Sequence, residues 1–140
     1  TDLWAAVDCG FAVNPPGVVK QIEGGLLFGL AAALWGKITP TADGVAERNF
    51  DGYRLLRLGE TPRVHVLLLD TGRAVLGGVG EAGTSAAIPA VANAVSRLRG
   101  TRLRTLPLVD AGSSAVATHD ASSPAVASLR LDPGGKGPLP

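Results

Sequence analysis

Apolar residues in this chain fall into short continuous runs and longer helical repeats. Residues 3–9 form an apolar run that stops at Gly10, and this run predicts a buried strand. Residues 18–35 place apolar side chains at every third or fourth position, which predicts a helix. Residues 64–70 form a further apolar run and predict a second buried strand.

A hairpin and a second helix are also predicted. Short strand-like runs on both sides of the polar segment 40–44 are typical of a hairpin. Residues 84–98 return to helical spacing. We expect this helix to begin near Ile88, because Pro89 is tolerated only in a first turn or at a kink. Residues 101–109 are a candidate for a last strand.

Beyond residue 108 the pattern ends. Residues 109–140 are rich in Ala, Ser, Gly and Pro and show no periodicity. Such a segment buries too little apolar surface to offset the entropy of ordering it. We therefore predict a partial domain at residues 1–108 and a disordered tail at residues 109–140. The expected fold class is α+β, with two main helices packed on short mixed strands.

Composition excludes several classes of function. The formal net charge of +1 gives no field that would attract a polyanion, so we expect no nucleic-acid binding. A single cysteine, with His65 and His119 far apart, offers no metal-ligand spacing, and we expect no metal held by protein ligands. The most apolar window, residues 24–36, is shorter than the roughly 18 residues that a bilayer requires, so no membrane span is expected.

The densest glycine cluster is GGVGEAG, at residues 77–83. Glu81 is the one carboxylate in it and stands just before the second predicted helix. Three roles fit this position. Glu81 is a charge favoured by the helix dipole, an exposed loop residue, or a general base that a rigid turn holds in a cleft.

The same cluster fits the GxGxxG pattern of dinucleotide-binding units. In that alternative Gly78, Gly80 and Gly83 approach the pyrophosphate, and Asp110 binds the ribose. Asp110 lies farther along the chain than the pattern expects, and Glu81 places a negative charge where the pyrophosphate would lie. The alternative stays open on sequence grounds.

Gln21 and three glycines mark the first predicted helix. A glutamine amide offers two donors and one acceptor, so it can bind a heterocycle or a phosphate, although the motif taken alone favours an exposed polar residue on an amphipathic helix. Gly24, Gly25 and Gly29 each cost about 1 kcal/mol relative to alanine inside a helix. Their presence predicts that a sheet or a cofactor approaches this helix closely.

Three segments in this order resemble a known family. They are VDCGFAVNPPGVVKQIEGGLLFGLAAALWGKIT, NFDGYRLLRLGETPRVHV and GGVGEAGTSAAIPAVANAV. Together they resemble the C-terminal part of molybdenum hydroxylase large subunits, the xanthine dehydrogenase and aldehyde oxidase family. The most similar type is the isoquinoline 1-oxidoreductase β-subunit, or aldehyde dehydrogenase large subunit. The resemblance covers residues 3–108 and implies a fragment of the molybdopterin-binding domain.

The resemblance implies roles for both motifs. Glu81 corresponds to the active-site base in the hydroxylation of an aldehyde or N-heterocycle, with water as the source of oxygen. Gln21 corresponds to a hydrogen-bonding partner of the pterin. Ala82 stands where the family usually has proline, so the loop is expected to be less rigid. The glycines expected to let the backbone approach the cofactor are Gly24, Gly25, Gly80 and Gly83.

The resemblance also implies a cofactor and partners. The cofactor is molybdenum-molybdopterin, in its cytosine dinucleotide form, and iron–sulfur clusters are expected on a small partner subunit. The remainder of the large subunit is a further expected partner, and we expect the isolated chain to hold no stable molybdenum and to be inactive. A non-catalytic structural remnant is the alternative outside the enzymes. The sequence does not distinguish a cytoplasmic from a periplasmic location.

Overall fold

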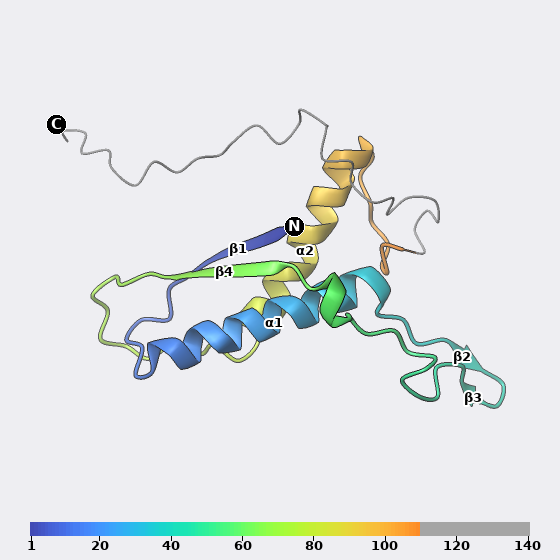
Figure 1. The fold of residues 1–140 in the computed structure, drawn as a ribbon, viewed down its shortest axis with the longest axis horizontal. Coiled ribbons are helices and arrows are strands. Elements are labelled where there is room, and N and C mark those ends of the chain that lie inside the picture. The colour runs from blue at the N-terminus through green and yellow to red at the C-terminus, as the bar shows by residue number, and fades with distance from the viewer. Residues whose placement is uncertain (110–140) are drawn as a thin grey trace.

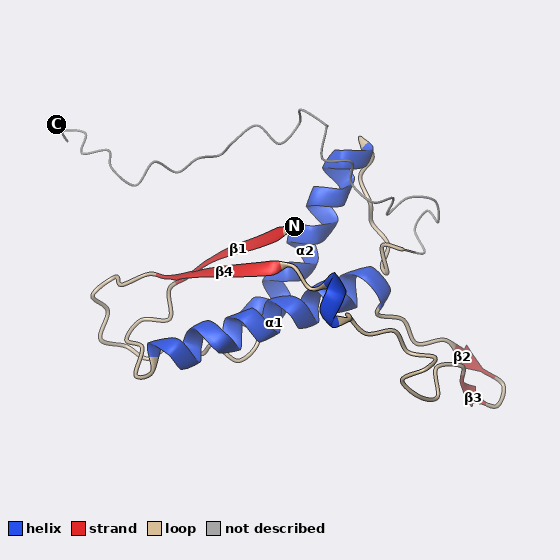
Figure 2. Cartoon of the chain, in the orientation of Figure 1, coloured by secondary structure: helices blue, strands red, loops and turns tan. Residues whose placement is uncertain are grey.

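The computed structural model describes residues 1–109, in which two long helices pack on short strands (Figure 1). The α+β class predicted from the sequence is confirmed. Figure 2 shows the two strand pairs as separate units. The elements in chain order are β1 (Asp2–Val7), α1 (Pro15–Trp35), β2 (Pro40–Thr41), β3 (Gly44–Val45), a short 3-10 helix (Leu58–Glu60), β4 (Arg63–Leu68) and α2 (Ala82–Arg99).

Strands β1 and β4 pair in parallel, and α1 lies between them in the chain. The register runs from Asp2 opposite Arg63 to Val7 opposite Leu68. Because side chains alternate across a strand, one face of this pair turns toward the helices. The core consists of Ile22, Leu26 and Ala87, with Ala5, Val7, Val18, Val64, Val66 and Val79 packed against it.

Helix α1 begins three residues before the predicted start, and its first turn explains why. The side chain of Asn14 caps the helix by accepting a hydrogen bond from the Gly17 amide at 3.2 Å. Pro15 and Pro16 occupy the first turn, where proline's missing amide hydrogen costs no helical hydrogen bond. A Pro-Pro-Gly sequence is typical of a turn, but at residues 15–17 it opens the helix.

The length of α1 corrects one argument from the sequence. With 21 residues it is long and apolar enough to cross a membrane by length and composition, whereas the predicted window was too short. The core helices of soluble proteins share this length and composition. In this structure α1 packs against both α2 and β4.

Helix α2 is the element that approaches the glycines of α1. A methyl group added to Gly29 would lie 2.5 Å from the carbonyl oxygen of Thr84, and one on Gly83 would lie 2.7 Å from the carbonyl oxygen of Ile22. Gly25 meets the same part of α2, but a methyl group on Gly24 would meet nothing within 4 Å. The close approach predicted from these glycines therefore comes from a helix.

The predicted start of the second helix is wrong. Helix α2 begins at Ala82, so Pro89 lies inside it. Proline removes one helical hydrogen bond and crowds the carbonyl of the residue four positions earlier, which here is Ser85. Both Pro89 and Ser85 are exposed, so the unpaired carbonyl faces solvent and the helix continues through the proline.

The predicted last strand is absent, because residues 101–109 form no strand. This segment instead returns to the end of α1, where the amide of Leu108 donates to the carbonyl of Ala33 at 2.8 Å and that of Val109 to Leu34 at 3.2 Å. These bonds satisfy carbonyls that a helix terminus leaves unpaired. The hairpin is present, but β2 and the first residue of β3 lie within the segment predicted as its turn. Except for Val109, the predicted tail lies outside the described residues.

Candidate functional site

An open groove lies where the start of α1 meets the glycine-rich loop. Its volume is about 640 Å³. The end of β1, the cap of α1 and the loop before α2 each supply part of its wall. The residues that line it include Cys9, Phe11, Val13, Asn14, Gln21, Val79 and Gly80.

A hydrogen bond joins the two sequence motifs at this groove. The Nε2 atom of Gln21 donates to the carbonyl oxygen of Gly80 at 2.8 Å, across 59 positions of sequence. Both residues are exposed. This bond uses one of the two N–H donors of the amide, so a second N–H and the Oε1 acceptor remain to offer to a ligand.

Backbone contacts hold the start of the glycine-rich loop against the end of β1. The Gly77 amide donates to the carbonyl of Cys9 at 2.8 Å, and the Phe11 amide donates to that of Val75 at 3.1 Å. Gly10 has a φ of 67°, and a methyl group there would lie 1.9 Å from the Val75 carbonyl oxygen. Glycine is therefore required at position 10 by both conformation and space.

Glu81 occupies the N-cap position of α2, next to Gly80 in the groove wall. Its side chain makes no capping hydrogen bond, and the residue is exposed. The cleft expected around a general base is therefore not closed by the described residues. The helix dipole at this position favours a carboxylate.

The four glycines predicted to approach the cofactor fall into two pairs. Gly25 and Gly83 are buried in the contact between α1 and α2, which already requires small residues there. Gly24 and Gly80 are exposed, and a methyl group on either would meet nothing within 4 Å. The backbone at the second pair is thus open to a ligand. Asn14 and Cys9, which were not predicted as site residues, line the same groove.

The geometry does not favour the dinucleotide-binding alternative. A GxGxxG loop of that kind follows directly on a strand of the sheet. Here β4 ends at Leu68, and between it and α2 the described chain has only a single bridge, from Leu76 to Gly10. Asp110, the proposed ribose ligand, lies outside the described residues.

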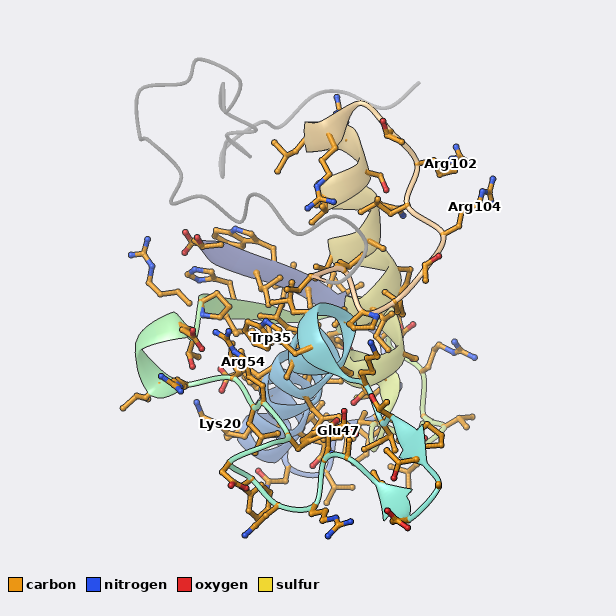
Figure 3. The ribbon with its side chains drawn as sticks, turned by 90° about the vertical axis from the view of Figure 1, so that its right-hand side faces the viewer. Lys20, Trp35, Glu47, Arg54, Arg102 and Arg104 are labelled. Atoms are coloured by element: carbon orange, nitrogen blue, oxygen red, sulfur yellow. The ribbon has the colours of Figure 1, made fainter. Side chains whose placement is uncertain are left out.

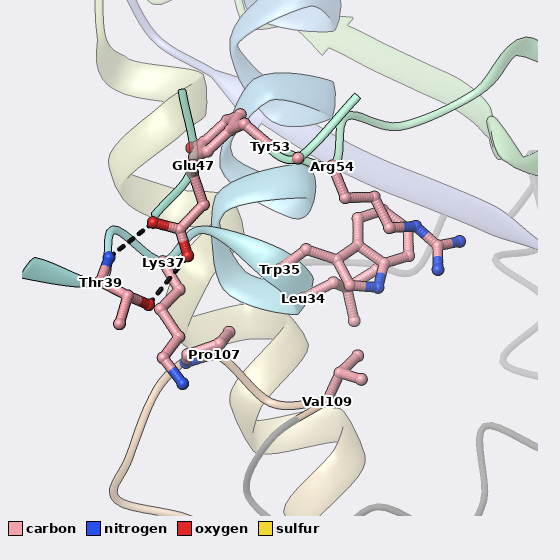
Figure 4. Close-up of a pocket in the computed structure, with 10 residues that line it drawn as sticks. Leu34, Trp35, Lys37, Thr39, Glu47, Tyr53, Arg54, Pro107 and Val109 are labelled. Carbon is pink, nitrogen blue, oxygen red and sulfur yellow. Dashed lines mark hydrogen bonds between the residues drawn. The ribbon is translucent and has the colours of Figure 1, made fainter. Parts of the chain in front are cut away.

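A second cavity, of about 300 Å³, lies at the opposite end of α1 (Figure 4). The carboxylate of Glu47 accepts hydrogen bonds from the amide and the hydroxyl of Thr39, at 2.7 and 2.8 Å. Both hydrogen bonds lower the pKa of the Glu47 carboxyl, and the bond from the Thr39 amide has the larger effect. The guanidinium of Arg54 lies 4.1 Å from the centre of the Trp35 ring (Figure 3). The Glu47 bonds close the base of the hairpin, and the Arg54 contact holds the following loop against the end of α1.

Comparison with known proteins identifies the family. Residues 1–62 match the family described as molybdopterin cofactor-binding domain. The chain is 38% identical over 106 residues to the isoquinoline 1-oxidoreductase subunit beta of Brevundimonas diminuta. It is 36% identical over 107 residues to the membrane-bound aldehyde dehydrogenase [pyrroloquinoline-quinone] of Gluconacetobacter polyoxogenes. The chain belongs to the molybdenum hydroxylase family.

Solved structures support the same assignment for this molybdenum hydroxylase chain. A Cu,Mo-CO dehydrogenase matches with a TM-score of 0.64 and 27% identity, over 73% of this chain and 14% of the other. Quinoline 2-oxidoreductase from Pseudomonas putida 86 shares the fold, with a TM-score of 0.66 over 74% of this chain and 14% of the other. The matches to the two sequence relatives each cover 76% of this chain. They cover only 13% of the isoquinoline 1-oxidoreductase subunit and 14% of the aldehyde dehydrogenase.

The residues at the groove fit a molybdenum–pterin group in their donor types. Among residues 1–109, no group of three or more His, Cys, Asp or Glu side chains could hold a metal ion. The exposed amide of Gln21 offers hydrogen bonds to a planar heterocycle, and the open backbone at Gly80 in the groove wall allows its close approach. Gly24 is exposed on α1 but does not line the groove.

Proposed function

We propose that this chain supplies the general base and a pterin contact to a molybdenum hydroxylase that oxidises an aldehyde or an N-heterocycle. The observation that carries the proposal is the hydrogen bond between Gln21 and Gly80, because it brings the glutamine motif to the residue beside Glu81. The names of the relatives, which include isoquinoline, aldehyde and quinoline oxidoreductases, support both substrate classes.

In this proposal Glu81 accepts a proton at its carboxylate. When bound, the molybdenum–pterin group would supply the two-electron redox chemistry of the hydroxylation, with water as the source of oxygen. Glu81 suits proton transfer because its carboxylate makes no capping hydrogen bond within the described residues. Its efficiency as a base depends on water being excluded, and polypeptide outside this chain would have to cover its exposed side.

The cofactor contacts are assigned to the open part of the groove. The spare N–H and Oε1 of Gln21 hydrogen-bond the pterin, and the backbone at Gly80 lets it approach. Gly25 and Gly83 contribute indirectly, by allowing α1 and α2 to pack closely behind the groove. We further propose the cytosine dinucleotide form of the pterin, and a small partner subunit whose iron–sulfur clusters carry the electrons away.

Turnover in isotope-labelled water tests this function. The enzyme that carries this sequence should convert an aldehyde or an N-heterocycle, and the new oxygen in the product should come from the labelled water. A matched reaction under labelled dioxygen in ordinary water should leave the product unlabelled. Absence of turnover with both substrate classes, in enzyme loaded with molybdenum, would contradict the proposal and favour a structural remnant.

A further inference from the structure

We propose that Gln21 is a positioning residue for Glu81, in addition to any contact with a cofactor. The carbonyl that accepts its hydrogen bond at 2.8 Å belongs to Gly80, and the same peptide unit ends at the nitrogen of Glu81. A peptide unit is planar, so a bond that holds the carbonyl also holds that nitrogen. The inference rests on the proposed function, because it concerns the orientation of the proposed base.

The segment that carries Glu81 lies between two anchored residues. On one side Val79 packs against the core, and on the other Gly83 is buried against α1. Between them Gly80, Glu81 and Ala82 are all exposed. The backbone of Glu81 is not helical, with φ −120° and ψ 2°, and its own side chain makes no capping bond. The Gln21 amide is therefore the side-chain contact that ties this short segment to α1.

Gln21 is itself fixed relative to the start of α2. Its neighbour Ile22 is 1% exposed, and the carbonyl of Ile22 would lie 2.7 Å from a methyl group on Gly83. Helix α1, which carries the Gln21 donor, and helix α2, which Glu81 caps, thus touch within one turn of the hydrogen bond. Because Gln21 lies on a packed helix and the loop ends at buried Gly83, the hydrogen bond restricts the movement of the loop.

One side chain then serves two contacts. The Nε2 atom holds the loop through one hydrogen, while the second hydrogen and Oε1 stay available to the pterin. Rotation of the amide to satisfy one contact would disturb the other. In this arrangement the cofactor and the base are aligned through the same glutamine.

Substitution Gln21→Glu tests the positioning role with little change in shape. A carboxylate cannot donate to the Gly80 carbonyl, but a protonated carboxyl can. The first turn of α2 reports on the loop, because the Ser85 amide donates to the Glu81 carbonyl at 3.1 Å. In the full chain at neutral pH, exchange of the Ser85 amide hydrogen should speed up about two- to tenfold relative to the wild type, since one hydrogen bond is lost.

Acid should reverse this effect. As pH falls through about 4.3, the ordinary pKa of a glutamic acid, the ratio of variant to wild-type exchange should return toward one. The charged groups on the same turn of α1 are Lys20 and Glu23, which pair at 2.6 Å, and Glu81 caps α2 next to the bonded Gly80. A role in packing alone would give no recovery in acid, because protonation hardly changes the size of the side chain.

Glu23→Gln is the matched control. It changes a carboxyl on the same turn of α1, and this carboxyl pairs with Lys20 and not with the loop. It should leave Ser85 exchange unchanged. Exchange in Gln21→Glu that equals the wild type at neutral pH, or that stays fast in acid, overturns the positioning role. If the variant chain does not fold alone, the same ratios are measured in the whole enzyme. The proposed function fails separately, if a Glu81 variant turns over normally.

Discussion

At the scale of single residues, polar side-chain contacts hold together backbone segments that lie far apart in the sequence. The Gln21 bond to Gly80 is one example, and the carboxylate of Asp2 is another. Asp2 lies 2.9 Å from Nε2 of His65 and 3.0 Å from Nε of Arg63, so it links β1 to β4 at the end of the sheet. The ring of Trp4 stacks on His65 beside this contact.

The Asp2 contact makes the fold sensitive to acid. The hydrogen bond with His65, followed by the contacts with Arg63, lowers the pKa of Asp2 below its ordinary 3.8. A lowered folded-state pKa means that the stabilisation is present above the unfolded value and is lost as pH falls through the folded value. Asp2→Asn should therefore make the free energy of unfolding fall less steeply with acidification below about pH 4.

Chemical denaturation at a series of pH values measures this effect. Asp43→Asn, in the exposed hairpin turn, is the control and should retain the wild-type dependence. If Asp2→Asn and the wild type show the same acid dependence, the contact of Asp2 with His65 and Arg63 does not contribute to the pH dependence of the free energy of unfolding.

At the scale of elements, the contact between α1 and α2 positions the site. Both helices approach through backbone and small side chains, because Gly25, Gly29 and Gly83 leave no room for a methyl group without a shift. The start of α2, and with it Glu81, is placed by this contact. A change in helix separation would therefore move the proposed base without touching it.

A pair of alanine substitutions separates packing from helix propensity. Gly29→Ala should destabilise the fold by about 1–3 kcal/mol, because its methyl group would lie 2.5 Å from the Thr84 carbonyl oxygen. Gly24→Ala meets open space and should stabilise the helix by about 0.5–1 kcal/mol. Urea unfolding of both variants measures the difference. Equal effects of the two substitutions would contradict the account of the helix contact.

The sequence pattern predicted the elements better than it predicted their ends. The strands at the start and middle of the chain and both helices are present, because apolar periodicity reports burial directly. The start of α2 was missed because the helix continues through Pro89, and the packing of α2 against α1 overrides the low helix propensity of proline. The strand at 101–109 was a wrong prediction, because its amides find partners on the end of α1 and not on a strand.

The candidate site was predictable only in its parts. Gln21 and Glu81 stand out by motif, but the bond between Gln21 and Gly80 joins residues 59 positions apart, which local periodicity cannot report. Gly25 and Gly29 on α1 correctly predicted a close approach, but the partner is helix α2 and not the predicted sheet or cofactor. Two of the four predicted cofactor glycines, Gly25 and Gly83, lie in the helix contact.

At the scale of the whole molecule, many large apolar side chains remain exposed. Phe50 is 78% exposed, Trp4 76% and Leu58 94%. We expect other polypeptide to cover part of this apolar surface. The chain spans 13% of the isoquinoline oxidoreductase subunit that it resembles, which leaves ample polypeptide in such a protein to cover these residues.

The isolated chain should therefore hold no stable molybdenum. The groove is open, and residues 1–109 offer no cluster of metal ligands. Metal analysis of the purified chain, after expression in a host that makes the cofactor, checks this expectation. Stoichiometric molybdenum together with turnover of an aldehyde would show that the chain is sufficient by itself.

The most direct test of the account is turnover of the intact enzyme with Glu81→Gln. The amide has nearly the size of the carboxylate but cannot accept the proton, so kcat should fall by about a hundred- to ten-thousand-fold. Molybdenum content and the unfolding midpoint should stay at wild-type values, and Glu23→Gln should keep full activity. A Glu81→Gln enzyme that retains molybdenum and turns over at the wild-type rate would contradict the assignment of Glu81 as the base.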